Sequence, residues 1–381
     1  MKHFSYLIIS VSLLLITSGQ SIAQSKFGPS YVRCATMERV NAYILNASQT
    51  KTGVNRRSGS VITGSPLNNY RLNAVVYVPI VVHIVLPNPY IITDADVQAQ
   101  IDRLNFDFSG LNDDSTNAPA EFLALRGHSK IQFCLAKRKP NGQVTSGIER
   151  RVSSVTSVPL SRDPVKFSAE GGLDAWDPTA YLNLWIGADD NGGDVLGYAQ
   201  FPGSSPIEED GVFINYKSWG TNSCYTLPGY NKGRTATHEI GHYFGLLHIW
   251  GDDEGCDGDD FRSLAGLGST CNLPAGLYNP DGQGNGPSDV GDTPNQAGST
   301  TNCPSTAVSD ACSVSPGPGR MFQNQMDYSL DACLTMFTKK QVERMEWVLE
   351  NCRSGLVASL GCQPPTSSIT RDAAPLHSVN P

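Results

Sequence analysis

The chain has 381 residues, enough for one large domain or two modest ones with a substantial core. Its 28 Lys and Arg stand against 36 Asp and Glu, and the formal net charge is −8. No basic cluster is longer than Lys137–Lys139. This balance argues against a nucleic-acid partner, because phosphate binding requires a basic surface.

The N-terminus has the pattern of an export signal. Lys2 and His3 precede an apolar run from Tyr6 to Ile16, and small residues follow as far as Ala23. We predict a signal peptide over residues 1–23 and a secreted protein that has no membrane association once the signal is removed. The alternative, a membrane anchor, requires a longer apolar stretch than these eleven residues.

Composition divides the remaining chain into three parts. Residues 24–72 are polar and carry Arg56-Arg57, which suggests a propeptide with its processing region. Residues 73–362 hold the strand and helix patterns and form the predicted catalytic domain. Residues 363–381 are rich in Pro and Ser and are predicted to be a disordered tail.

Strand and helix patterns alternate along the predicted catalytic domain. The first strand is Val75–Leu86, rich in β-branched residues, and further strands are predicted at 131–136, 181–187 and 211–216. Thr93 is a predicted N-cap for a helix, and a second helix begins near Gly233. Thr338 starts a capping box for a final helix, whose buried stripe would contain Val342, Met345, Val348 or Leu349, and Cys352.

The ten cysteines fit an oxidising compartment. Seven lie beyond residue 250, in a region rich in Gly, Asp and Pro that cannot be held by core burial alone, so we expect disulfides there. Cys134 lies in an apolar strand and is predicted to be a buried thiol.

Three of the seven histidines fall within eleven residues, at spacings that suit a metal. His238 and His242 are four residues apart and therefore share one helix face. Gly245 can take a left-handed conformation, end the helix and return His248 to the same ion. Three neutral imidazoles with one open position are typical of a catalytic zinc site. Glu239 would take a proton from the attacking water and deliver it to the leaving amine.

With these residues the sequence resembles the metzincins, and specifically the pappalysin family of secreted metallopeptidases. The signature His-Glu-x-x-His-x-x-Gly-x-x-His is matched at every fixed position, and Met326 follows His248 by 78 residues in a methionine turn, Asn324-Gln-Met326-Asp-Tyr328. The resemblance implies an α+β fold, in which a mixed twisted sheet and an active-site helix lie above the cleft. An irregular, disulfide-linked C-terminal subdomain would lie below it.

The same resemblance assigns further residues. Met326 would form an apolar floor beneath the zinc ligands, and Tyr328 would stabilise the oxyanion, although it can also be an ordinary packed tyrosine. Asp331 would bind Arg or Lys just after the scissile bond, unless it merely caps a turn. The implied disulfides are Cys303–Cys333 and Cys256–Cys312.

Several assignments stay open at this point. Cys352 and Cys362 are close enough in sequence for a local disulfide, and Cys224 and Cys271 are left without assigned partners. Similarity and clustered oxygens suggest structural calcium at Asp292 and Thr293, with Asp259 or Asp260, although such loops are more often simply solvated. A long Gly-rich stretch between Cys256 and Asp292 resembles an insertion.

Cys34 is the predicted inhibitory ligand of the zymogen. It lies in Tyr31-Val-Arg-Cys-Ala-Thr36, which resembles an Arg-Cys-Gly-Thr segment of family propeptides, with Ala35 in place of the glycine. The propeptide would then silence the enzyme through a thiolate on zinc, until cleavage near Arg57 or Tyr70 removes it. The alternative makes Cys34 half of an ordinary disulfide.

The function predicted is therefore a secreted zinc endopeptidase that acts on proteins or peptides, with its own propeptide as inhibitor. A different zinc hydrolase, such as an amidase or aminopeptidase, would share the ligands, but the long signature and the methionine turn argue against it. A catalytically dead binding module would have lost Glu239 or a ligand, and none is lost.

Overall fold

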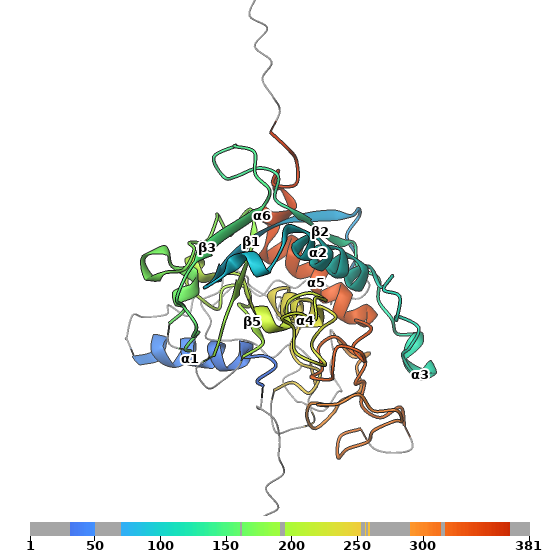
Figure 1. Ribbon diagram of the computed structural model, residues 1–381. Helices are drawn as coiled ribbons and strands as arrows, with labels where there is room; N and C mark the ends of the chain where they lie inside the picture. Colours follow the sequence, from blue (N-terminus) through green and yellow to red (C-terminus); the bar gives the residue numbers. More distant parts are fainter. Residues whose placement is uncertain are drawn as a thin grey trace, which may run out of the picture. The chain divides into compact units, whose positions relative to one another are not determined.

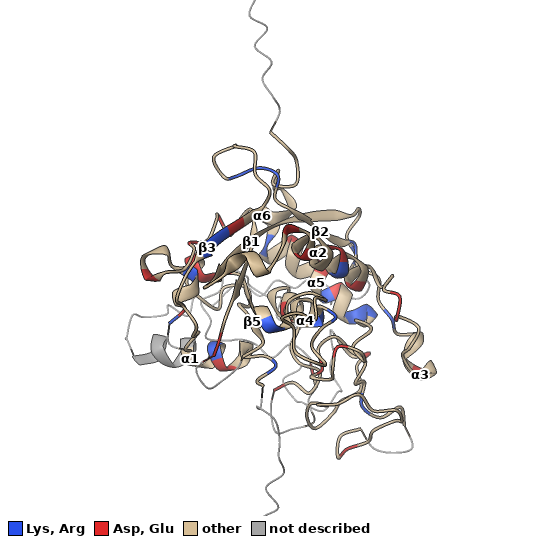
Figure 2. Ribbon diagram, viewed as in Figure 1, with Lys and Arg blue, Asp and Glu red and all other residues tan. Residues whose placement is uncertain are grey.

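The computed structural model describes residues 31–49, 70–160, 162–190, 195–252, 256, 258–259, 290–313 and 317–365. The predicted signal peptide and the Arg56-Arg57 site therefore lie outside the described residues, and so does most of the predicted tail. None of the described helices has the length and apolar character that crossing a membrane requires. Acidic and basic residues alternate over the elements of the fold (Figure 2).

A six-stranded sheet is organised around its longest strand, β1 (Val76–Leu86). The first half of β1 pairs in parallel with β2 (Ile131–Leu135), and the second half pairs on that edge with β3 (Ile148–Val152). On the other edge the order continues through β4 (Leu182–Gly187) and β6 (Val212–Asn215) to the antiparallel β5 (Gly197–Ala199). The mixed sheet of the predicted α+β fold is thus present, with the short β5 at its end.

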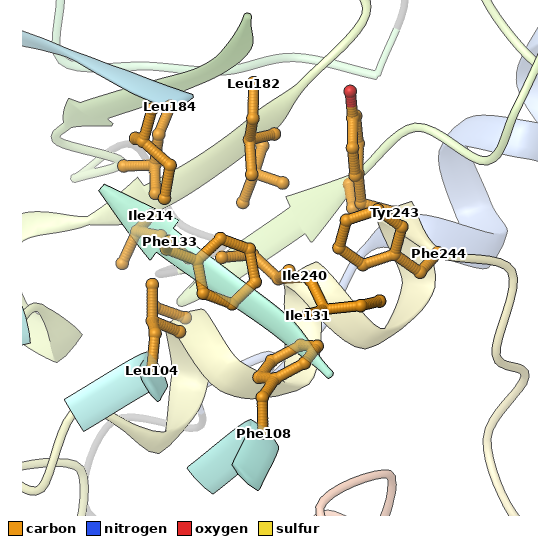
Figure 3. Packing of buried hydrophobic residues seen from close by; sticks show 14 of the residues in the cluster. Leu104, Phe108, Ile131, Phe133, Leu182, Leu184, Ile214, Ile240, Tyr243 and Phe244 are labelled. Carbon is orange, nitrogen blue, oxygen red and sulfur yellow. The ribbon is translucent and has the colours of Figure 1, made fainter. Parts of the chain in front are cut away.

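One face of the sheet packs against helices. Alternate strand residues such as Ile80, Leu184 and Ile214 join α2 (Asp94–Ser109) and α4 (Arg234–Tyr243) in the main core. Figure 3 shows Leu104 and Phe108 of α2 near Phe133, with Ile240 and Phe244 of the α4 segment on the same side. Because side chains alternate along a strand, the intervening strand residues point to the opposite face of the sheet.

The opposite face is covered by irregular chain. Val85, Trp185, Phe213 and Tyr198 form a second cluster there with Val158 and other residues of the 155–175 segment. That segment contains the short 3₁₀ helices η2 (Pro164–Lys166) and η3 (Ser168–Glu170). Further one-turn elements are η1 (Pro89–Ile91), α3 (Ala120–Leu123), η4 (Ile207–Glu209), η5 (Tyr216–Ser218) and α6 (Ser354–Val357).

The helix starts follow the predicted chemistry. Thr93 caps α2 and Thr338 caps α5 (Lys339–Cys352), each in a capping box whose second member is Asp96 or Gln341. Both side chains satisfy backbone N–H groups that the first turn leaves free. The buried face of α5 contains Val342, Met345, Val348 and Leu349, whereas Cys352 is only half-buried.

Two regions can now be distinguished. The upper region, residues 76–250 with α5, contains the sheet and the helices described above. The lower region, residues 251–337, forms no helix or strand among its described residues. It contains the disulfides Cys303–Cys333 and Cys256–Cys312.

The cysteine predictions need two corrections. Cys134 is not a free thiol, because it is bonded to Cys362 across 228 residues of sequence. The pairing of Cys352 with Cys362 is therefore also wrong, and Cys352 is itself disulfide-bonded. Among the described residues Cys224 is a free, exposed thiol and Cys34 a free, buried one.

The predicted propeptide contributes a helix that the sequence analysis does not anticipate, α1 (Thr36–Gln49). Figure 1 shows α1 near β5, and the residues before α1 approach the same edge of the sheet. Leu196 donates to the Val32 carbonyl at 2.9 Å, and the Ala35 N–H donates to the Gly197 carbonyl at 3.0 Å. Residues 32–35 therefore extend the sheet beyond its edge strand.

Candidate metal centre and active site

Three imidazole rings converge at the C-terminal end of α4. The Nε2 atoms of His238, His242 and His248 lie 3.1–3.2 Å from one another, and all three side chains are buried. His238 and His242 project from one face of the helix, as their four-residue spacing predicts. The structure therefore brings together all three histidines of the motif.

Gly245 makes the third histidine available. Its φ is +85°, a left-handed conformation that a side chain would disfavour. The Gly245 N–H donates to the His242 carbonyl at 2.8 Å, and the Leu246 N–H returns to the Gly241 carbonyl at 3.0 Å. This ending reverses the chain after α4 and places His248 opposite the two helical histidines.

Each imidazole is oriented by an acceptor at its second nitrogen. His238 Nδ1 lies 2.7 Å from the Gln325 carbonyl, His242 Nδ1 lies 2.7 Å from the Leu246 carbonyl, and His248 Nδ1 lies 2.5 Å from Asp252 Oδ1. With Nδ1 bound in this way, Nε2 carries the free lone pair and points to the centre.

Charge and protonation suit a cation at this point. Burial lowers the pKa of His238 well below its usual value and lowers that of His242 to about 3. These two rings are therefore neutral and can act as ligands near neutral pH. Three imidazole nitrogens with a buried sulfur beside them match the ligand chemistry of zinc.

The sulfur belongs to Cys34 of the predicted propeptide. The Cys34 Sγ atom and the three ligand nitrogens all lie within 4.8 Å of one another, and they form the one group of three or more such ligands found among the described residues. Burial, followed by the charge of Glu239, raises the pKa of the Cys34 thiol well above its usual value. Cys34 is not disulfide-bonded, which removes the alternative considered for it.

Glu239 is buried between the histidines and the propeptide. Its Oε2 accepts a hydrogen bond from the Cys34 thiol at 3.4 Å and another from the Thr36 hydroxyl at 3.1 Å. Its Oε1 has no partner among the described residues. Burial raises the pKa of Glu239 to about 8.

The methionine turn lies directly under α4. Met326 is fully buried, and a Cβ atom added to Gly241 would lie 2.5 Å from its sulfur. The preceding residue supplies the carbonyl that orients His238. The turn therefore supports the ligands both by packing and by a direct hydrogen bond.

Tyr328 lies on the same side of the centre as Cys34. Its hydroxyl donates to the Cys34 carbonyl at 3.3 Å, and its ring lies edge-on to His248 with centroids 4.8 Å apart. Burial raises the pKa of Tyr328 well above its usual value. The hydroxyl therefore remains protonated and able to donate to an oxygen at the centre.

Asp331 forms a buried anionic pocket at the N-terminal end of α4. Its Oδ2 accepts hydrogen bonds from the backbone of Lys232 at 2.9 Å and Arg234 at 3.3 Å. Its Oδ1 accepts from both terminal nitrogens of Arg33, at 3.3 and 3.4 Å. An arginine of the propeptide therefore occupies the pocket that the sequence analysis assigned to a basic substrate residue.

The residues suggested for calcium make contacts with other protein groups. Thr293 donates to Asp259, and the Lys340 N–H donates to Asp292 Oδ2 at 3.0 Å. Asp260 lies outside the described residues. In the part of the chain that is described, these oxygens form no ligand group of three or more.

Sequence reasoning missed Thr36, Trp250 and Asp252. Thr36 bridges Glu239 and the Ala199 N–H, and the Trp250 ring stacks on His248 at 4.4 Å. Asp252 has one available signal, because a carboxylate four residues after a ligand can reach its second nitrogen. Thr36 could be found only from a structure, since its partners are more than 160 residues away.

Comparisons with known proteins agree with this geometry. The family model described as Pregnancy-associated plasma protein-A matches residues 170–350. A Tannerella forsythia promirolysin mutant is 35% identical, with a TM-score of 0.64, and the match covers 85% of this chain and 97% of that one. Mature mirolysin of the same organism, in complex with a cleaved peptide, is 39% identical with a TM-score of 0.62 over 75% of this chain and 96% of that one.

A curated relative, an extracellular metalloprotease of Neurospora crassa, is 36% identical over 170 residues, or 43% of this chain and 46% of that protein. The chain thus spans about half the length of the curated relatives it matches. The fold and the three-histidine site define a metzincin, and the chain belongs to the pappalysin family of these metallopeptidases.

Proposed function

We propose that this protein is a secreted zinc endopeptidase that is made as a zymogen and hydrolyses peptide bonds of proteins. The observation that carries the proposal is the convergence of three imidazole nitrogens beside Glu239, whose Oε1 has no partner among the described residues. Casein digestion that is inhibited by phenanthroline, with one zinc per chain by metal analysis, is the expected result. If the His242→Ala variant kept both its full zinc content and its activity, the proposal would be contradicted.

Glu239 is the proposed general base and acid. A zinc ion held by His238, His242 and His248 would supply a Lewis acid that polarises the scissile carbonyl and activates a water. Glu239 takes the proton of the attacking water and transfers it to the leaving amine.

Tyr328 is the proposed donor to the oxyanion. Its hydroxyl contacts the main-chain carbonyl of Cys34, the residue whose sulfur lies among the histidines. A substrate carbonyl at the same centre would therefore lie within reach of a protonated hydroxyl. Tyr328→Phe should lower kcat more than it raises KM, whereas a tyrosine with a packing role alone would affect stability instead.

Asp331 is the proposed specificity group for Arg or Lys just after the scissile bond. Support comes from Arg33, which already contributes two charge-assisted hydrogen bonds to this carboxylate. A peptide library should show a basic preference at that position. Asp331→Ala should remove the preference, although it also removes two backbone contacts at the start of α4.

The propeptide is the proposed inhibitor, with Cys34 as fourth zinc ligand. Its main chain extends the sheet edge, Arg33 fills the pocket of Asp331, and the Thr36 hydroxyl donates a hydrogen bond to Glu239. Cleavage near Tyr70-Arg71 or at Arg56-Arg57 would release it. A cobalt-substituted zymogen carrying Glu239→Ala should show a sulfur-to-cobalt band that disappears with Cys34→Ala. A band that persists without Cys34 would contradict this role.

A structural calcium ion near Asp259, Asp292 and Thr293 is proposed as well. It rests on the family resemblance and on the acidic, Gly-rich sequence around these residues. Calcium chelation at full zinc occupancy should lower the melting temperature. Unchanged stability and activity after chelation would rule the ion out.

A further inference from the structure

A second arginine of the propeptide has its own binding site on the catalytic domain. Arg39, in the first turns of α1, donates from its Nη2 to the Val158 carbonyl at 2.7 Å and to the Pro159 carbonyl at 3.3 Å. Its Nη1 lies 3.3 Å from Asp163 Oδ2, and its guanidinium carbon lies 3.6 Å from the centroid of the Tyr198 ring. Only 10% of this side chain remains exposed.

The groups that hold Arg39 are fixed by the catalytic domain and not by the propeptide. Asp163 is fully buried and accepts a hydrogen bond from the Tyr198 hydroxyl, and Lys166 Nζ lies 3.1 Å from its Oδ2. Lys166 is held in turn by the Gln200 side chain at 2.9 Å and the Glu209 carbonyl at 2.7 Å. The carboxylate therefore keeps its position and two of its partners when Arg39 leaves.

The chemistry of this site selects a guanidinium group. Two carbonyls, a carboxylate and an aromatic face surround one planar cation, which matches the forked donors and flat surface of arginine better than the compact ammonium of lysine. A cavity of about 210 Å³ adjoins Arg39 and is lined in part by Val40, Gln200, Ser204 and Glu209. Removal of the propeptide would open this space further and leave the Val158 carbonyl without its Arg39 donor, whereas the Pro159 carbonyl keeps the Arg162 N–H at 3.2 Å.

The site lies on the opposite side of the histidines from Asp331. Arg33 binds at the N-terminal end of α4, where Asp331 accepts from the Lys232 and Arg234 backbone. Val40, next to Arg39, packs against Phe201 and Leu247, beyond the C-terminal end of α4. Cys34, between the two arginines in sequence, contacts the centre. If the Asp331 pocket receives the residue after the scissile bond, the Arg39 site faces the residues before it.

We propose that Asp163, Tyr198 and the carbonyls of Val158 and Pro159 form a second arginine-binding subsite, which Arg39 fills in the zymogen. In the processed enzyme an arginine on the N-terminal side of the scissile bond fills it. The inference rests on the proposed peptidase function and adds a second specificity determinant to it. The enzyme would thus favour segments with arginines on both sides of the cleaved bond.

The competing interpretation makes this site an anchor for the propeptide alone. Both interpretations predict that Arg39→Ala weakens latency, so that substitution does not separate them. They differ only in what the processed enzyme does with substrates, and the test must therefore be made after the propeptide has been removed.

The experiment uses the full chain, allowed to process itself, and a set of peptides that all carry Arg after the scissile bond. Arg, Lys or Gln is placed in turn at each of the four preceding positions. We expect Arg at one of these positions to raise kcat/KM roughly tenfold over Gln, the gain typical of a charge-assisted hydrogen bond, with Lys intermediate. Equal rates for Arg and Gln at every position would overturn the subsite and leave the proposed function intact. If no peptide is cleaved, the proposed function fails, and this inference fails with it.

Variants locate the effect. Asp163→Asn should bring the Arg-to-Gln ratio of kcat/KM close to one. Arg150→Gln, which removes a cation of β3 that pairs with Asp94 and does not line this site, should preserve the wild-type ratio. A ratio unchanged by Asp163→Asn would overturn the assignment to this site. If Asp163→Asn fails to fold because Lys166 loses its partner, Tyr198→Leu removes the aromatic face, and the wild-type peptide series still decides the question.

Discussion

The upper and lower regions are held together in different ways. In the upper region, alternate strand residues and two helices share a continuous apolar core, and the helices begin at side-chain caps. In the lower region, where the described residues form no helix or strand, two disulfides and buried polar side chains fix the chain. Asp310, for example, accepts hydrogen bonds from the backbone of Ala297, Cys312 and Ser313 and pairs with Arg320.

This difference in packing separates the residues of the candidate site into two groups, one from each region. The upper region supplies two histidines and Glu239 on a helix that packs into the core. The lower region supplies, on irregular chain, the Gln325 carbonyl that contacts His238 and the Tyr328 hydroxyl that donates to the Cys34 carbonyl. Chemistry that needs fixed geometry is placed where burial is extensive. The four predictions below test this division.

The largest effect is expected from Glu239→Gln. Because general acid and base catalysis contributes about 10²–10⁴-fold, we expect kcat/KM to fall about 10³-fold. Zinc content should remain unchanged, since Glu239 is not a predicted ligand. In the lower region, Met326→Leu conserves volume and should reduce kcat/KM less than tenfold. Equal losses in the two variants, measured on one peptide, would contradict the division.

The next effect concerns stability. The Cys303–Cys333 disulfide closes 30 residues of the lower region, and its removal by paired alanine substitutions should cost about 3 kcal/mol. Hydrogen exchange should increase within 290–337 first, while the amides of β1 and β4 remain protected. As a control, removal of the Cys134–Cys362 disulfide should not increase hydrogen exchange selectively in the lower region. Uniform loss of protection in the first variant would show that the regions unfold together.

A smaller effect is expected where the regions meet, at Gly241. Replacing a helical glycine by alanine gains about 1 kcal/mol, but here the new methyl group would lie 2.5 Å from the Met326 sulfur. Overpacking costs about 1–3 kcal/mol, so Gly241→Ala should destabilise the protein by about 1 kcal/mol in denaturant unfolding. In a Met326→Ala background the same substitution should become stabilising. Absence of this sign change would mean that the two residues do not interact.

The last effect concerns the pH dependence of stability, which has opposite signs in the two regions. In the upper region, burial outweighs Arg234 and raises the pKa of Asp107 to about 6. The folded state therefore binds this proton more tightly than the unfolded state, whose carboxyl titrates at about 3.9. Stability from Asp107 is present at low pH and is lost as the pH rises through about 6. Asp107→Asn should accordingly gain stability relative to the wild type between about pH 4 and 6.

Asp310 is the matched group of the lower region. Its backbone hydrogen bonds from Ala297, Ser313 and Cys312 outweigh burial and hold its pKa below the usual value. Its contribution is therefore present above about pH 4 and is lost as the pH falls below that value. The unfolding free energies of Asp310→Asn and the wild type should differ by a constant amount above about pH 4 and converge below it. A slope between pH 4 and 6 in this difference would contradict the assignment.

Sequence patterns were most informative in the upper region, because periodicity there reflects burial. The strand predicted at Val75–Leu86 is β1, and the helix predicted after Thr93 is α2 with that residue as cap. β3 was missed because its residues, Ile-Glu-Arg-Arg-Val, lie at the edge of the sheet and are largely half-exposed. Its charged side chains therefore lack the apolar pattern of the central strands.

Cys134 shows a different limit. Its apolar neighbours suggested burial, but Ile131 and Phe133 face the core and Cys134 lies on the alternate, half-buried side of β2. Strand periodicity could have shown this orientation. The partner, Cys362, is 228 residues away, and no local pattern specifies such a pairing.

The residues of the candidate site could be predicted only where they belong to one short sequence motif. His238, His242, His248 and Glu239 were found because helix geometry fixes their relations within eleven residues. The Arg39 site was not found, since its groups come from α1, the 155–175 segment and β5. Such convergence depends on the tertiary structure alone.

The Cys134–Cys362 disulfide also has a mechanical consequence. Residues 361–364 lie against the sheet, where the Lys137 N–H donates to the Gly361 carbonyl at 2.8 Å and Arg138 donates to the Pro364 carbonyl at 3.0 Å. Figure 1 shows this end of the chain above the sheet, away from α4. If the chain is pulled between its N-terminus and a tether attached beyond Pro365, the covalent path of the force runs through the disulfide into β2. The chain between the two cysteines, including α4 and α5, lies outside that covalent path until the bond is reduced.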